Sequence, residues 1–121
     1  MPKKQYLYKI YPPRHDFYLN QNADEKKVLS QHIKYWQALS DKKLSVVYGP
    51  IYEPKGTFRM AIIEVRNRDE AENIAMQDPA ILSGIFTYVL FPMQMGIVRQ
   101  EVGYSSEPSL TDARMAEVSM D

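Results

Sequence analysis

The sequence contains no cysteine, which excludes disulfides, thiolate nucleophiles, iron–sulfur clusters and cysteine-based zinc sites. It also lacks an excess of either charge, because 15 Lys and Arg residues balance 15 Asp and Glu residues. A neutral chain creates no broad field that would attract nucleic acid or an anionic membrane. The sequence has no apolar run of about 20 residues and, at its start, no apolar core of a signal peptide. We therefore expect a cytoplasmic protein that binds neither nucleic acid nor membrane.

Common catalytic motifs are missing as well. There is no glycine-rich phosphate loop, no nucleophile elbow and no HExxH pattern, which argues against nucleotide-dependent and common hydrolytic chemistry. The chain has two histidines, without a carboxylate at the spacing typical of metal ligands. We therefore predict no metal and no cofactor.

The 121 residues, 45% of them apolar, suffice for one modest core. We predict one domain over residues 1–102, followed by a polar tail or dimer arm over residues 103–121. Helical spacing predicts a long helix over 23–40 and a shorter one over 69–76. Asp78-Pro79 predicts the start of one further helical turn, which Gly84 ends.

Alternating apolar residues predict the strands. Four strands are predicted, at residues 5–11, 44–48, 57–65 and 86–93, and residues 96–102 are a candidate fifth. In the first strand, Tyr6, Tyr8 and Ile10 share one face. Gly49-Pro50 closes the second strand. The resulting β-α-β-β-α-β order predicts an α+β, ferredoxin-like fold with an antiparallel sheet whose helices cover one face.

The strands carry apolar residues on both faces, although the helices cover only one. An exposed apolar face is an aggregation hazard in a monomer. We therefore expect a homodimer in which two sheets stack across a two-fold axis into a barrel-like assembly. The alternative is that the C-terminal tail folds across the open face within one chain.

His32 and Asp78 are the candidate catalytic residues. His32 lies in the apolar stripe of the first helix and is expected to point inward, where an imidazole can move protons near neutral pH. Asp78 would fix the tautomer of the imidazole if the second helix ends near it. The alternatives remain a structural core histidine and an aspartate that only caps a helix.

Four further residues are candidates for contacts with a small-molecule ligand. Arg14, in the loop with His15, offers a guanidinium that matches an anionic or phenolic group, although such residues are often simply solvated. Tyr35 and Trp36 on the first helix are pocket wall, packing, or both. Tyr48 ends the second strand and is the fourth candidate.

Several short elements resemble the YCII-related family of small dimeric α/β-barrel proteins. They are Pro12-Pro13-Arg14, His32 with Tyr35-Trp36, Gly49-Pro50, Asp78-Pro79-Ala80 and Pro92-Met93. The resemblance, over about residues 5–98, implies that His32 and Asp78 are the active-site pair. One branch of the family resembles lyases that eliminate chloride from hydroxylated aromatics. Another branch has an arginine three residues before the histidine, where this chain has Leu29.

We therefore expect an acid–base enzyme that acts on a small polar or aromatic molecule, with a lyase-like reaction as a candidate. The alternative is a non-catalytic module that binds a ligand or a partner and in which His32 and Asp78 are structural. A third reading, nucleic-acid regulation, lacks a basic helix.

Overall fold

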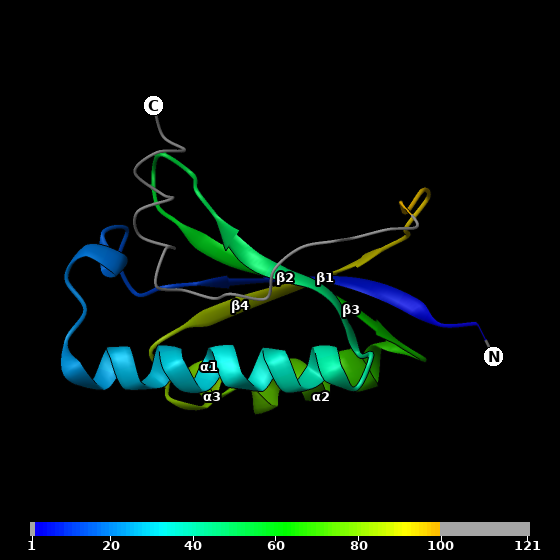
Figure 1. Cartoon of the computed structure of the whole chain (residues 1–121), viewed down its shortest axis with the longest axis horizontal. Helices are drawn as coiled ribbons and strands as arrows, with labels where there is room; N and C mark the ends of the chain where they lie inside the picture. Colours follow the sequence, from blue (N-terminus) through cyan, green and yellow to red (C-terminus); the bar gives the residue numbers. More distant parts are fainter. Residues whose placement is uncertain (1, 100–121) are drawn as a thin grey trace.

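The computed structural model describes residues 2–99, which form one four-stranded sheet and the helices that cover it (Figure 1). The elements, in chain order, are β1 (Lys4–Tyr11), η1 (Phe17–Leu19), α1 (Ala23–Asp41), β2 (Ser45–Ile51), β3 (Phe58–Val65), α2 (Arg68–Gln77), α3 (Pro79–Leu82) and β4 (Thr87–Met93). The sheet has the order β2-β3-β1-β4, and every neighbouring pair is antiparallel. The predicted α+β class with one antiparallel sheet is confirmed.

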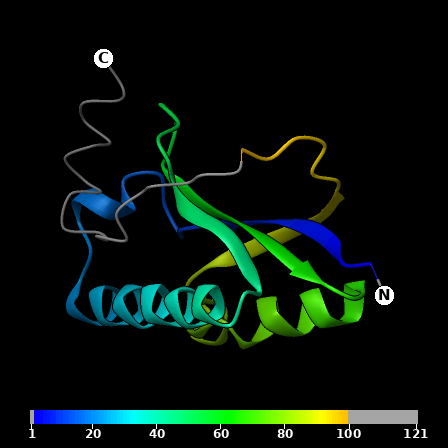
Figure 2. The same ribbon diagram turned by 45° about the vertical axis from the view of Figure 1, so that its right-hand side comes forward.

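All three α-helices lie on the same face of the sheet, as two views of the molecule show (Figures 1 and 2). The helical spacing predicted this packing for α1, since Leu29, His32, Trp36 and Leu39 are its inward residues and are all buried. The predicted single turn after Asp78 is α3, and Gly84 follows it with a φ of 80° that suits glycine.

Two strand predictions differ from the structure. We expected Gly49-Pro50 to close the second strand, but β2 continues to Ile51 and Pro50 pairs with Arg59. Proline is tolerated there because β2 is an edge strand, where the missing N–H breaks no ladder between two neighbours. Residues 96–99 of the candidate fifth strand belong to no strand. Residues 100–102 and the predicted tail over 103–121 lie outside the described residues.

A row of apolar residues crosses the face of the sheet opposite the helices. One row of paired residues, Val47, Ile62, Leu7 and Phe91, crosses all four strands on this face. Val47 and Phe91, at its two ends, are 50% and 48% exposed.

No helix within residues 2–99 is long and apolar enough to cross a membrane.

Candidate functional site

The carboxylate of Asp78 lies fully buried beneath α1, where four hydrogen-bond donors converge on it. Trp36 Nε1 and the Tyr8 hydroxyl donate to Oδ2, over 2.8 and 2.7 Å. The backbone N–H of Ala80 donates to Oδ1 over 2.9 Å. His32 Nδ1 lies 2.8 Å from both oxygens. The predicted pairing of His32 with Asp78 is therefore present in the structure.

The donors keep Asp78 ionised. Burial alone raises the pKa of a carboxyl group, but the hydrogen bonds from His32, Trp36 and Tyr8, with the attraction of His32, outweigh it and lower the pKa of Asp78. The same burial and the negative charge of Asp78 raise the pKa of Tyr8, which stays a neutral phenol. Asp78 is thus a fixed acceptor around which the donors are arranged.

An ionised carboxylate only accepts hydrogen bonds, so His32 Nδ1 must carry a proton. The other ring nitrogen, Nε2, is also buried, and it makes no hydrogen bond within the described part of the chain. A buried polar atom without a partner is uncommon in folded proteins. Its position on an oriented imidazole is what a general base requires, because Asp78 fixes the tautomer that leaves the lone pair on Nε2.

Local sequence and strand register together assemble the site. Asp78 has a second, structural role, since its Oδ1 accepts a hydrogen bond from the Ala80 N–H and caps α3 as predicted. Across the sheet, Tyr48 pairs with Ala61 and Ala61 pairs with Tyr8. The two tyrosines therefore lie on either side of a buried alanine on the face that meets α1, and Trp36 stacks on both tyrosine rings.

Aromatic rings surround the His32 imidazole. The Tyr48 ring centroid lies 5.5 Å from that of His32, and Phe86 stacks nearly parallel to the imidazole at 6.4 Å. Trp36 stacks on Tyr8 at 4.9 Å and lies nearly parallel to Tyr48 at 6.1 Å. These rings form a low-dielectric surrounding in which the charge of Asp78 acts strongly.

The two tyrosines predicted to contact a ligand differ in their hydrogen bonds. The Tyr35 hydroxyl donates to the carbonyl oxygen of Ile74 over 2.7 Å, so it ties α1 to α2, and burial raises the pKa of Tyr35 to about 12. The Tyr48 hydroxyl instead accepts from Nη1 of the buried Arg59 over 3.1 Å. Sequence reasoning did not single out Arg59 or Tyr8 as site residues.

Arg14 lies in the loop after β1 and is bound within the chain. Its Nη1 and Nη2 donate to the two carboxylate oxygens of Glu25, both over 2.8 Å, and its Nε donates to Asn20. Glu25 also completes a capping box with Asn22 at the start of α1. Arg14 therefore anchors the loop to the helix, and its predicted contact with a ligand stays a prediction.

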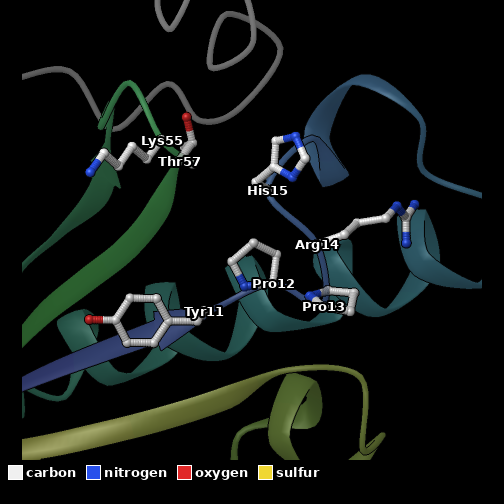
Figure 3. Close-up of a pocket in the computed structure, with 8 residues that line it drawn as sticks. Tyr11, Pro12, Pro13, Arg14, His15, Lys55 and Thr57 are labelled. Carbon is white, nitrogen blue, oxygen red and sulfur yellow. The ribbon is translucent and has the colours of Figure 1, made fainter.

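One open cavity, of about 300 Å³, lies between this loop and the turn that joins β2 to β3. It is lined by Tyr11, Pro12, Pro13, Arg14, His15, Lys55, Gly56 and Thr57. Figure 3 shows that the His15 ring lies on the side of Thr57, whereas Arg14 extends away from it. Neither His32 nor Asp78 lines this cavity, so it is separate from the pair.

Residues 2–99 place no group of three or more His, Asp or Glu side chains close enough together to hold a metal ion. The imidazole of His32, oriented by Asp78, is a group that can transfer protons.

Comparisons with known proteins bear on the family and the fold. A family model described as the YCII-related domain matches residues 7–94, which is more than half of the chain. Among solved structures, the chain is similar to 5-chloro-2-hydroxyhydroquinone dehydrochlorinase from Burkholderia phenoliruptrix AC1100, in complex with 2,5-dihydroxybenzoquinone. The identity is 18%, the TM-score is 0.59, and the match covers 76% of this chain and 95% of the dehydrochlorinase. No curated protein sequence matches the chain.

Proposed function

The chain belongs to the YCII-related family, and on that premise we propose that it is an enzyme that performs acid–base chemistry on a small molecule. The observation that carries this proposal is the buried His32 imidazole, whose Nδ1 is held by Asp78 while Nε2 has no described partner. An oriented imidazole with an unmatched basic nitrogen is poised to take a proton from a substrate and return it.

The reaction class that we propose is an elimination that needs no metal or organic cofactor. His32 Nε2 takes a proton from the substrate, the electrons of the broken bond form a new double bond, and a leaving group departs with its own electron pair. The similarity in fold to a dehydrochlorinase supports this class, since that protein binds 2,5-dihydroxybenzoquinone, a small oxygenated ring. The aromatic surrounding of His32 suits such a ring.

The proposal is tested with the neighbour's own compounds. We expect wild-type protein to bind 2,5-dihydroxybenzoquinone and to release chloride from 5-chloro-2-hydroxyhydroquinone, with the same rate after treatment with a chelator. His32→Gln should lower the rate about 100-fold or more, because general base catalysis typically contributes that much. The exposed second histidine offers a matched control, and His15→Gln should leave the rate unchanged.

Folded wild-type protein that neither binds the quinone nor releases chloride would favour the alternative, a non-catalytic interaction module. An unchanged rate in His32→Gln would also refute the proposal.

We further propose that the protein acts as a homodimer in which the apolar sheet face of one chain packs on that of a second copy. The row from Val47 to Phe91 supports this, because it crosses the whole sheet and matches itself across a two-fold axis. Sedimentation should show a dimer for the wild type and for Leu82→Asp, whose leucine is exposed on α3. Phe91→Asp should shift the protein to the monomer. A wild-type monomer at micromolar concentration would indicate that the tail covers the face.

The cytoplasmic location stays a prediction.

A further inference from the structure

The tyrosine hydroxyls around His32 are not equivalent as hydrogen-bond donors. The hydroxyl proton of Tyr8 is donated to Asp78 and that of Tyr35 to the carbonyl oxygen of Ile74. The Tyr48 hydroxyl accepts a hydrogen bond, and its partner is a guanidinium, which can only donate. The Tyr48 proton therefore remains to be donated, and Tyr48 donates no hydrogen bond to any group within residues 2–99.

Arg59 fixes the Tyr48 hydroxyl. The Arg59 side chain is buried, with 2% of the residue exposed, on the face of β3 that meets the helices. Its Nη1 donates to Tyr48 over 3.1 Å, and its Nε donates to the Tyr18 hydroxyl over 3.3 Å. A cation that donates to a phenol oxygen polarises the O–H bond and strengthens the hydrogen bond that this group donates. Burial raises the pKa of Tyr48, and Arg59 acts against that rise.

The ring that carries this polarised donor lies beside the His32 imidazole. The ring centroids of Tyr48 and His32 are 5.5 Å apart, and the Tyr48 ring is held nearly parallel to Trp36. Within the described residues, the site thus has one basic nitrogen without a donor and one phenol proton without an acceptor. A ligand that satisfies both must present an acidic proton and, near it, an oxygen atom.

We propose that Tyr48, positioned by Arg59, donates a hydrogen bond to the substrate oxygen that becomes negative when His32 Nε2 removes a proton. The bond from carbon or oxygen to that proton breaks, the proton moves to Nε2, and the electron pair is delocalised onto the oxygen that Tyr48 contacts. No oxidant or reductant takes part. The substrate class is a small planar enol, phenol or hydroxyquinone. This inference rests on the proposed function and adds the group that stabilises the oxyanion.

The test compares two quinones that differ in acidic hydroxyls. We would titrate 2,5-dihydroxybenzoquinone, and 2,5-dimethoxybenzoquinone as the analogue that cannot ionise, and follow the fluorescence of Trp36, which is the chain's single tryptophan. The variants are Tyr48→Phe and Arg59→Met. Tyr88→Phe is the matched control, since the Tyr88 hydroxyl already has an acceptor in Glu72. Thermal unfolding would check that each variant folds.

We expect Tyr48→Phe to weaken binding of the dihydroxy compound roughly 10- to 100-fold, the effect of one hydrogen bond to a charged group. Arg59→Met should weaken it several-fold, and Tyr88→Phe should not. The dimethoxy compound should bind the wild type more weakly and lose little in any variant. Arg59→Met keeps the Tyr48 hydroxyl, so it decides the question if Tyr48→Phe does not fold.

Three results would overturn the inference. If both quinones lose affinity equally in the variants, the two residues are only structural. If the dihydroxy compound binds Tyr48→Phe and Arg59→Met as tightly as the wild type but fails to bind His32→Gln, the oxyanion role is wrong and the proposed function stands. If the wild type binds neither quinone, the inference fails together with the proposed function.

Discussion

Replacing Asp78 with asparagine tests how the buried carboxylate holds the site together. The amide has one acceptor oxygen where the carboxylate has two. If that oxygen occupies the Oδ1 position, the amide NH₂ faces Trp36 Nε1, which can only donate. If it occupies the Oδ2 position, the NH₂ faces the backbone N–H of Ala80, which can also only donate. Either orientation therefore leaves one buried donor without an acceptor.

The expected loss of stability follows from this geometry. An unsatisfied buried donor costs about 1–3 kcal/mol, and the remaining hydrogen bonds lose the strength that a charged acceptor gives them. We expect Asp78→Asn to lower the free energy of unfolding by about 2–4 kcal/mol at pH 7. With a urea slope of about 1–2 kcal/mol per molar for a small domain, the midpoint should fall by about 1–4 M.

Urea unfolding at a fixed protein concentration measures the effect, because a dimer's stability depends on concentration. Asp69→Asn is the matched control, since Asp69 is an exposed residue in the first turn of α2. Its loss should be about 0.3–1 kcal/mol, from the helix dipole alone. A midpoint for Asp78→Asn equal to that of Asp69→Asn would refute the argument that Asp78 is a buried acceptor.

Three other predictions concern charge and hydrogen bonding. The stability advantage of wild type over Asp78→Asn should be full above the ordinary carboxyl pKa of 3.8 and should disappear as the pH falls through the lowered pKa of Asp78, as urea midpoints across pH would show. Carbon NMR should give Glu25 a pKa of about 2 in the wild type, and one nearer the ordinary 4.5 in Arg14→Met, because the Arg14 hydrogen bonds lower it. Trp36→Phe should raise the pKa of Asp78, measured in the same way, and should cost about 1–3 kcal/mol of stability.

The helices could be predicted well because their signals are local. The stripe on α1 identified His32 and Trp36 as inward residues, and the Asp-Pro pair identified the cap of α3. The contact between His32 and Asp78 joins residues 46 positions apart, and the helix pattern alone left it open. The resemblance to the YCII-related family supplied that pairing, which is why it was expected before the structure.

Arg59 and Tyr8 were missed as site residues, although the sequence carried a signal for each. Tyr8 alternates with Tyr6 and Ile10, which placed it on one face, but not on the face with Asp78. Arg59 alternates with the inward residues of β3, and a charge at an inward strand position indicates a buried polar contact. The sequence did not indicate the hydrogen-bond partner of Arg59, because only the pairing of β2 with β3 brings Tyr48 close to it.

The site depends most on strand register, which no local pattern gives. Tyr48, Ala61 and Tyr8 form one row across β2, β3 and β1 on the helix side, while Val47, Ile62 and Leu7 form the next row on the open side. A slip of one residue would exchange the two faces of a strand. It would put Tyr48 on the apolar face and Val47 against α1. The same strand pairing therefore fixes both the apolar row that we assign to the dimer interface and the row of Tyr48, Ala61 and Tyr8 that forms part of the proposed active site.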